Sequence, residues 1–200
     1  MLTLRSAPPS PFGRKIKIAL SILGLMDQTK IIVADTNDEK DSLRKENPLG
    51  KIPCLMDENG TAIYDSFVIL DWLNERAGGN RLFPAHGPER TRVLTLNALA
   101  DGMMDAGVLL IYEQRWREPA MRSDKWTAHH QAKIDRALAV LEAAPPKGPV
   151  DIAHIAVACA LGYFDLRFAG SWRAKHPKLV AWLDDFAKAV PSFEATRAPA

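Results

Sequence analysis

The spacing of apolar residues changes near residue 80 of this 200-residue chain, and that change restricts its fold more than any other feature. Before it, short apolar runs typical of strands alternate with segments in which apolar residues recur every three or four positions, as in amphipathic helices. After it, only helical spacing is found. Residues 78–88 are rich in Gly and Pro and are typical of a linker. We therefore predict a mixed α/β domain over residues 1–78, a linker over 79–87 and an all-helical domain over 88–200.

The first domain carries signals for four strands and two helices. Ser10 is a natural N-cap and Pro11 a natural first helical residue. Asn59-Gly60 is a strong hairpin signal, and Ser66 is expected to cap the second helix. The predicted strands are 2–4, 30–34, 53–57 and 62–64, and the predicted helices are 11–23 and 66–75. A βαβ unit followed by a ββα unit predicts one mixed four-stranded sheet with helices on its faces.

After the linker, the sequence predicts helices alone. They cover approximately 89–117, 124–143, 151–168 and 177–189. Breaks rich in Pro or Gly separate them. The longest apolar run, Ile155–Phe164, is too short to cross a bilayer and is typical of a buried helix.

The composition is that of a globular protein without a dominant charge. Apolar residues make up 47% and charged residues 25% of the chain, which is the profile of a folded protein rather than a disordered one. Lys and Arg number 26 against 24 Asp and Glu, a net charge of +2. This balance gives no reason to expect nucleic acid or an anionic membrane as a partner. The first ten residues lack the basic-then-apolar pattern of a secretory signal.

Cysteine and histidine spacing argues against metal and dithiol chemistry. Cys54 and Cys159 form no Cys-x-x-Cys pair, so we expect neither a zinc ribbon nor a dithiol redox site. Two free thiols suit a reducing cytoplasm, where we expect the protein to reside. The five histidines lack metal-site spacing with carboxylates, such as His-Glu-x-x-His, and we expect no bound metal.

Ser10 lies at the predicted turn from strand to helix. At such a turn several backbone N–H groups point outward and the helix dipole is positive, so the position stabilises an anion. A thiol bound here would shift toward its thiolate, because a hydrogen bond and a helix terminus can together lower its pKa by about one or two units. The alternative is that Ser10 only caps the helix.

Two further clusters have the chemistry to hold a peptide-like ligand. Lys51-Ile52-Pro53 precedes the hairpin, and a cis bond before Pro53 would turn the N–H and C=O of Ile52 outward to pair with an extended peptide. An ordinary proline at a strand start is the alternative. At the end of the last strand, Ser66 could meet a carboxylate and Asp65 an ammonium group, which suits an α-amino acid head group. A plain helix cap is the alternative there.

In this order and at these separations, the three clusters resemble those of the cytosolic glutathione transferase family. Ser10-Pro11-Phe12 is similar to the motif of its serine-type members, and Asp65-Ser66 to its γ-glutamyl-binding pair. Asn47-Pro48-Leu49-Gly50-Lys51-Ile52-Pro53 is similar to its Asn-Pro-x-x-x-[Val/Ile]-Pro motif. The resemblance covers the whole chain. It implies a thioredoxin-like first domain, an all-helical second domain, glutathione as co-substrate and a homodimer.

The resemblance also implies a role for each motif residue. Ser10 would hydrogen-bond the glutathione sulfur. Pro53 would be cis, and Ile52 would pair with the cysteinyl backbone. Asp65 and Ser66 would hold the γ-glutamyl end.

Two other positions are less determined. Lys51 could meet the glycine carboxylate of glutathione, but a solvated surface lysine is an equal alternative. The family often begins the core helix of its second domain with Ser/Thr-x-x-Asp, where this chain has Asp151-Ile152-Ala153-His154. A charged His is disfavoured near a helix N-terminus, so the sequence predicts that His154→Asp raises stability by about 0.5–1 kcal/mol.

Three functions are compatible with these residues. The leading interpretation is an enzyme that adds the glutathione thiolate to a small hydrophobic electrophile. Glutathione-dependent reductase or isomerase chemistry is disfavoured by serine at position 10, which cannot form a mixed disulfide. A non-catalytic binding or regulatory protein is the third. The helical domain would supply the electrophile pocket, although Met and aromatic residues at helical spacing are also typical of a core. The candidates are Met103, Met104, Val108, Tyr112, Arg115 and Trp116.

Overall fold

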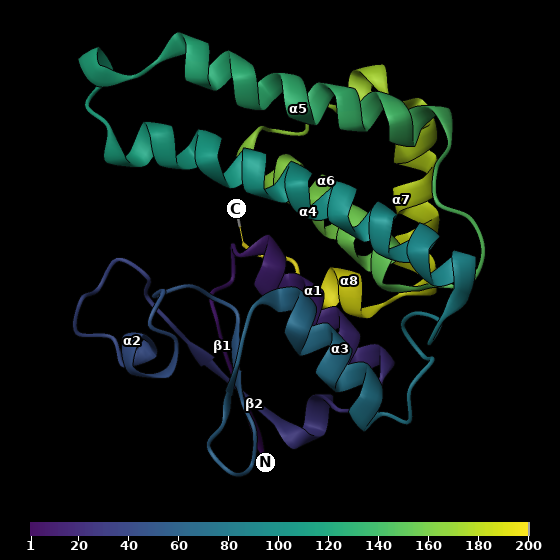
Figure 1. Cartoon of the computed structure of the whole chain (residues 1–200). Helices are drawn as coiled ribbons and strands as arrows, with labels where there is room; N and C mark the ends of the chain where they lie inside the picture. The colour runs from purple at the N-terminus through teal and green to yellow at the C-terminus, as the bar shows by residue number, and fades with distance from the viewer. Residues whose placement is uncertain (200) are drawn as a thin grey trace.

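The computed structural model of the chain describes residues 1–199. A small sheet with helices on its faces lies against a group of longer helices (Figure 1). The sheet domain contains β1 (Leu2–Ser6), α1 (Pro11–Ile22), β2 (Thr29–Val33), α2 (Leu43–Glu46), β3 (Cys54–Met56), β4 (Ala62–Ile63) and α3 (Ser66–Arg76). The helical domain contains α4 (Gly87–Trp116), α5 (Asp124–Ala143), α6 (Ile152–Arg167), α7 (Pro177–Ala189) and α8 (Ser192–Ala195).

The sheet is mixed and four-stranded, as predicted, with the order β2-β1-β3-β4. β1 pairs with β2 in parallel and with β3 antiparallel, so Leu4 lies between Ile31 and Leu55. β3 and β4 form the hairpin predicted around Asn59-Gly60. Successive side chains of a strand point to opposite faces. Leu55 therefore packs into the main core, whereas Cys54 packs on the other face with Leu43 of α2.

α6 forms the centre of the helical domain. Residues 152–161 are all buried, as the uninterrupted apolar run predicts. α6 packs against α4 on one side and against α1 of the sheet domain on another. The first helix of the sheet domain therefore contacts the core of the helical domain directly.

α4 is the longest helix, and by length and composition alone it could cross a membrane. It packs against both α5 and α6. Met103 and Met104 on α4 are fully buried, so apolar residues of this helix form part of the core of the helical domain.

The observed element boundaries differ from the predicted ones by a few residues. The third strand is shorter than predicted, and the short helices α2 and α8 were not predicted, because four-residue helices carry too little periodicity. The cap of α3 was assigned to the wrong residue. Asp65, not Ser66, is the N-cap, and its Oδ1 accepts from the N–H groups of Phe67 (3.0 Å) and Val68 (3.4 Å).

His154 lies near the N-terminus of α6, as predicted, but it is buried. It is only 4% exposed, and its ring lies 6.1 Å from that of Trp182 between centroids. Its Nδ1 lies 2.7 Å from Oδ1 of Asp151, which also caps α6 by accepting from the His154 N–H. Desolvation opposes ionisation of Asp151, but the hydrogen bonds from His154 outweigh it and leave the pKa of this carboxyl below its usual value.

The stability expectation for His154 is therefore reversed. In His154→Asp, a second carboxylate would lie buried beside Asp151 and leave space next to Trp182. We expect the free energy of unfolding to fall by about 2–3 kcal/mol, measured by urea denaturation. His154→Gln is the matched control, because a neutral amide can still donate to Asp151; it should lose less. An Asp variant as stable as the parent would contradict this account.

Candidate functional site

Ser10 lies between the end of β1 and the start of α1. It is the N-cap of α1, and its Oγ accepts from the Gly13 N–H at 3.0 Å. A hydroxyl has two acceptor lone pairs and one hydrogen. Capping therefore uses only acceptor capacity, and the Ser10 hydrogen remains for a ligand. The Ser10 hydroxyl can therefore cap the helix and donate a hydrogen bond to an anion at the same time.

Glycine at position 13 keeps this turn tight. A Cβ at Gly13 would lie 2.1 Å from Oγ of Ser6, which ends β1. Ser6 is itself buried, and its Oγ has no hydrogen-bond partner among residues 1–199. A buried hydroxyl is poorly placed to reach a ligand, so Ser10 is the better placed serine of this turn.

The Ile52–Pro53 peptide bond is cis, as the resemblance implied. Within residues 1–199, the backbone N–H and C=O of Ile52 take part in no hydrogen bond. The preceding turn is held by buried Asn47, whose Nδ2 donates to the Lys51 carbonyl at 2.8 Å and whose Oδ1 accepts from the Leu49 N–H at 3.1 Å. The turn leaves Ile52 with a free donor and a free acceptor, and the Lys51 side chain is exposed.

Arg5 holds the α2 segment that leads to this turn. From β1 its guanidinium reaches Asp41 (2.5 Å) and Glu46 (2.6 Å), and it also donates to Ser42 at 2.8 Å. Hydrogen bonds from the Leu43 and Asp35 N–H groups and from Arg5 hold the pKa of Asp41 below its usual value. No local sequence pattern indicated this network, because Arg5 lies more than 30 residues from each of its partners.

Asp65 and Ser66 begin α3, but only one of them is exposed. The Asp65 carboxylate is exposed while it caps the helix, and Ser66 is 5% exposed. Burial and Asp101 raise the pKa of Asp105 on α4, while the charge of Lys51 lowers it and that of Asp65 adds to the rise. The charges of Lys51 and Asp65 therefore both act on this residue of α4.

A buried ion pair joins the Ser10 helix to α4. Lys15 is 0% exposed, and its Nζ lies 2.5 Å from Oδ1 of Asp101. Oδ2 of Asp101 accepts from Nδ2 of Asn97 at 2.9 Å. The pair fixes α1 against α4, and no local pattern in the sequence indicated it.

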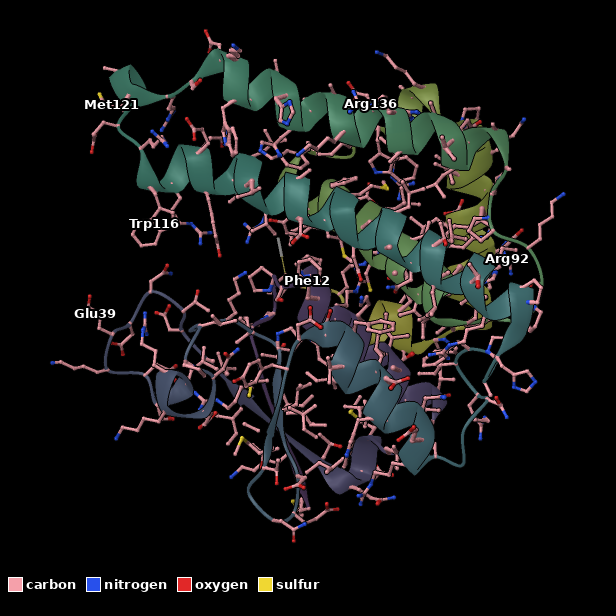
Figure 2. All side chains as sticks on the ribbon, in the orientation of Figure 1. Phe12, Glu39, Arg92, Trp116, Met121 and Arg136 are labelled. Carbon is pink, nitrogen blue, oxygen red and sulfur yellow. The ribbon has the colours of Figure 1, made fainter. Side chains whose placement is uncertain are left out.

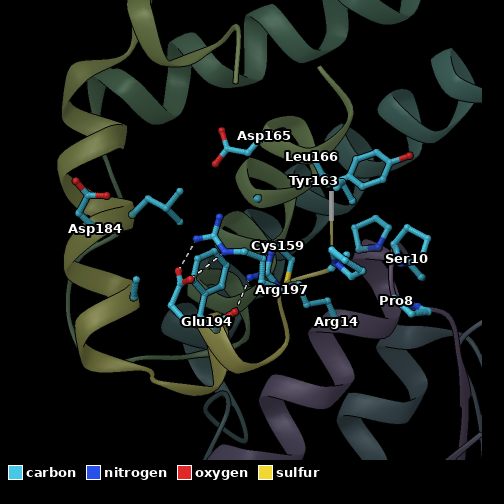
Figure 3. Close-up of a pocket in the computed structure, with 18 of the residues that line it drawn as sticks. Pro8, Ser10, Arg14, Cys159, Tyr163, Asp165, Leu166, Asp184, Glu194 and Arg197 are labelled. Atoms are coloured by element: carbon cyan, nitrogen blue, oxygen red, sulfur yellow. Dashed lines mark hydrogen bonds and ion pairs between the residues drawn. The ribbon is translucent and has the colours of Figure 1, made fainter. Parts of the chain in front are cut away.

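A cavity of about 360 Å³ lies beside Ser10, between α1, α6, α7 and α8. Figure 3 shows Ser10 and Tyr163 on one side and the pair Arg197–Glu194 farther toward Asp184. The lining includes neither Lys51, Ile52 and Pro53 nor Asp65 and Ser66. Of the predicted site residues, Ser10 alone therefore borders this cavity.

Three arginines that line the cavity are already engaged. Arg173 makes two hydrogen bonds to Asp165, and Arg197 makes two to Glu194. Buried Arg14 donates to the Phe193 carbonyl and stacks over the Phe193 ring, and desolvation lowers its pKa. These contacts occupy the three arginines with partners inside the protein.

Two family models match the chain. The glutathione S-transferase N-terminal domain matches residues 9–76, and the glutathione S-transferase C-terminal domain matches residues 124–185. The chain belongs to the glutathione S-transferase family. Both matched segments fall within the two domains described above, and the first contains all of the predicted site residues.

Several similar proteins match over most or all of their length. The Escherichia coli (strain K12) protein described as uncharacterized GST-like protein YibF is 34% identical over 182 residues, which are 88% of this chain and 89% of that protein. A family member from Pseudomonas fluorescens Pf-5, solved with bound glutathione, is 44% identical with a TM-score of 0.94, and each chain covers 100% of the other. A second Pseudomonas fluorescens Pf-5 structure holds S-(propanoic acid)-glutathione, with 43% identity, a TM-score of 0.90 and the same full coverage.

The residues predicted for an electrophile pocket divide into two groups. Met103 and Met104 are buried, which agrees with the alternative that methionines at helical spacing belong to the core. Tyr112, Arg115 and Trp116 are exposed, and Val108 is half-buried. Figure 2 shows Trp116 at the end of α4 pointing toward the sheet domain. The roles of these four stay predictions.

The cysteines are buried and unreactive. Burial raises the pKa of Cys54 to about 11 and that of Cys159 to about 12. Neither thiol forms a thiolate near neutral pH. In the part of the chain that the structure describes, no three His, Cys, Asp or Glu side chains gather in a group able to hold a metal ion.

Proposed function

We propose that this protein binds glutathione and transfers its thiolate to a small electrophile. The observation that carries the proposal is the geometry of Ser10, whose Oγ caps α1 through Gly13 and keeps its hydrogen to donate. A sulfur placed at this turn meets a hydroxyl donor and the positive end of a helix dipole. Both favour the thiolate, which is the nucleophile. The glutathione bound in the relative from Pseudomonas fluorescens Pf-5 supports the same ligand.

The remaining site residues would hold the rest of the tripeptide. The free N–H and C=O of Ile52, beside cis Pro53, are suited to pair with the cysteinyl backbone. Asp65 would meet the γ-glutamyl ammonium, and the N-terminus of α3 at Ser66 its carboxylate. Exposed Lys51 is suited to the glycine carboxylate.

In the proposed reaction the thiol loses its proton to water before or during attack. The thiolate sulfur then bonds to the electrophilic carbon of the second substrate. With a halogenated aromatic substrate, the carbon–halogen bond breaks and the halide leaves with the bonding electrons. The Ser10 hydrogen bond stabilises negative charge on sulfur, and no residue of the protein becomes covalently attached.

The test is to measure glutathione binding by calorimetry and turnover with 1-chloro-2,4-dinitrobenzene. We expect saturable binding and a rate well above that of the uncatalysed reaction. The analogue in which α-aminobutyrate replaces cysteine is the matched control, because it keeps the backbone and charges but has no sulfur. It should bind and give no product. Binding without turnover of any electrophile would favour the non-catalytic alternative, and no binding would overturn the proposal.

The resemblance also leads us to propose a homodimer in the cytoplasm. Exposed apolar side chains lie on both domains, including Leu49 and Val68 on the sheet domain and Leu109 and Val140 on the helical domain. Contact of one subunit's sheet domain with its partner's helical domain would cover such residues. We expect sedimentation at micromolar concentration to give twice the 22.1 kDa mass of one chain. A species of single mass would contradict the dimer.

A further inference from the structure

Tyr163 of α6 lies at the edge of the cavity beside Ser10, where α6 packs against α4. It lines the same cavity as Ser10. Its ring lies close to α4 at Gly107, where a Cβ would be 3.2 Å from the Tyr163 ring and 2.9 Å from the Phe164 ring. The tyrosine is therefore held in place between α6 and α4, close to where the sulfur is proposed to bind.

One arginine lies beside the Tyr163 ring of α6, and another lies beside the ring of Tyr112 on α4. The Arg167 guanidinium lies 6.0 Å from the centre of the Tyr163 ring, and the Arg115 guanidinium lies 5.9 Å from that of Tyr112. Burial raises the pKa of Tyr163, while the positive charges of Arg167 and Arg115 oppose that rise. We call Tyr112 and Arg115 of α4, with Tyr163 and Arg167 of α6, the α4–α6 cluster.

The charges of this cluster have no carboxylate partner. Unlike Arg173 and Arg197 of the cavity wall, neither Arg115 nor Arg167 forms an ion pair with any residue from 1 to 199. The Nε of Arg167 is buried and has no hydrogen-bond partner in the same part of the chain. A buried donor without a partner costs free energy, which a bound acceptor would recover.

We propose that the second substrate of this protein carries a carboxylate, which Arg167 and Arg115 bind while Tyr163 and Tyr112 contact its apolar part. Guanidinium groups bind carboxylates with charge-assisted hydrogen bonds, and the two tyrosine rings supply a flat apolar surface. This inference rests on the proposed transfer of glutathione. It restricts the second substrate to hydrophobic electrophiles that also carry a carboxylate.

The proposal is tested with two conjugates that differ in one group. Glutathione attacks 4-chloro-3-nitrobenzoate at the carbon bearing chlorine; the C–S bond forms, chloride leaves with the C–Cl electron pair, and the thiol proton goes to water. The product is S-(4-carboxy-2-nitrophenyl)glutathione. The corresponding 4-carbamoyl conjugate has the same shape and no added charge. Calorimetry on the whole protein at low salt should give an affinity about 10-fold higher for the carboxyl conjugate.

Variants assign the preference to the cluster. Arg167→Gln should reduce the carboxyl-to-carbamoyl affinity ratio to less than about 3, and Arg167→Lys, which keeps the charge, should retain part of it. Arg136→Gln on α5 is the control (Figure 2), because Arg136 is exposed and distant from the cavity lining, and the affinity ratio should not change.

Equal affinities for the two conjugates in the parent protein, or an unreduced affinity ratio in the double variant Arg115→Gln/Arg167→Gln, would overturn the carboxylate inference alone. If neither conjugate bound, the glutathione site itself would be wrong, and both proposals would fail.

Discussion

Replacing Ser10 with alanine is expected to lower the turnover number by about 10²–10³-fold, as expected for one donor lost from a developing anion. The donor matters because negative charge grows on the sulfur as glutathione becomes a thiolate. The pKa of the bound thiol should rise for the same reason, and the thiolate absorbance measured against pH should move with it. The Michaelis constant for glutathione should change much less, because the rest of the tripeptide is held elsewhere.

The structure adds a complication, because the same substitution removes a helix cap. Losing the Ser10–Gly13 hydrogen bond should cost about 1 kcal/mol of stability. Ser123→Ala is a matched control, since Ser123 caps α5 through the Trp126 N–H at 3.2 Å and is distant from the cavity lining. It should lose similar stability and keep its turnover. If Ser10→Ala kept full turnover and an unchanged thiol pKa, Ser10 would be a cap only, and a backbone N–H would have to activate the sulfur.

Removing the charge of Asp65 is expected to weaken glutathione binding by about 2–3 kcal/mol, which is roughly 30- to 150-fold in the dissociation constant. Asp65 is proposed to bind the γ-glutamyl ammonium, whose charge does not change during reaction. Turnover at saturating glutathione should therefore remain within a few-fold of the parent value. Calorimetry gives the affinity, and steady-state kinetics gives the turnover.

The choice of substitution follows from the cap of α3. Asp65→Ala would remove both the charge and the acceptor for the Phe67 N–H, so stability and binding would fall together. Asn is also a good N-cap, so Asp65→Asn removes the charge and keeps the cap. Binding that weakened in the alanine variant but not in the asparagine variant would show that Asp65 acts through the helix rather than on the ammonium.

Much of the fold could be predicted because the deciding signals are local. Asn59-Gly60 determines a hairpin within a few residues, and Ser10-Pro11 marks the start of α1 in the same way. The buried α6 follows from one continuous apolar run. The cis bond at Pro53 was different, because local chemistry left it open and only the ordered set of motifs favoured it.

The contacts between the two domains and the burial of individual side chains could not be predicted, because they depend on which residues distant in sequence pack together. Lys15 and Asp101 are 86 positions apart, and each alone looks like a solvated surface charge. Met103 and Arg115 lie on the same long helix, yet one is buried and the other exposed, which depends on where α5 and α6 pack. His154 shows the same limit, because the effect of a substitution there changes sign with burial.

The Lys15–Asp101 pair has a consequence for exchanging domains between relatives. A chimaera that joined this sheet domain to another helical domain would bring a fully buried ammonium to the new junction. Without an acid at the position of Asp101, that charge would have no counterion, and breaking such a buried pair typically costs about 3–5 kcal/mol. The domain boundary near residue 80 is thus a poor junction for a chimaera. Helix α1 should be exchanged together with the part of α4 that contains Asp101, because this carboxylate neutralises the buried Lys15.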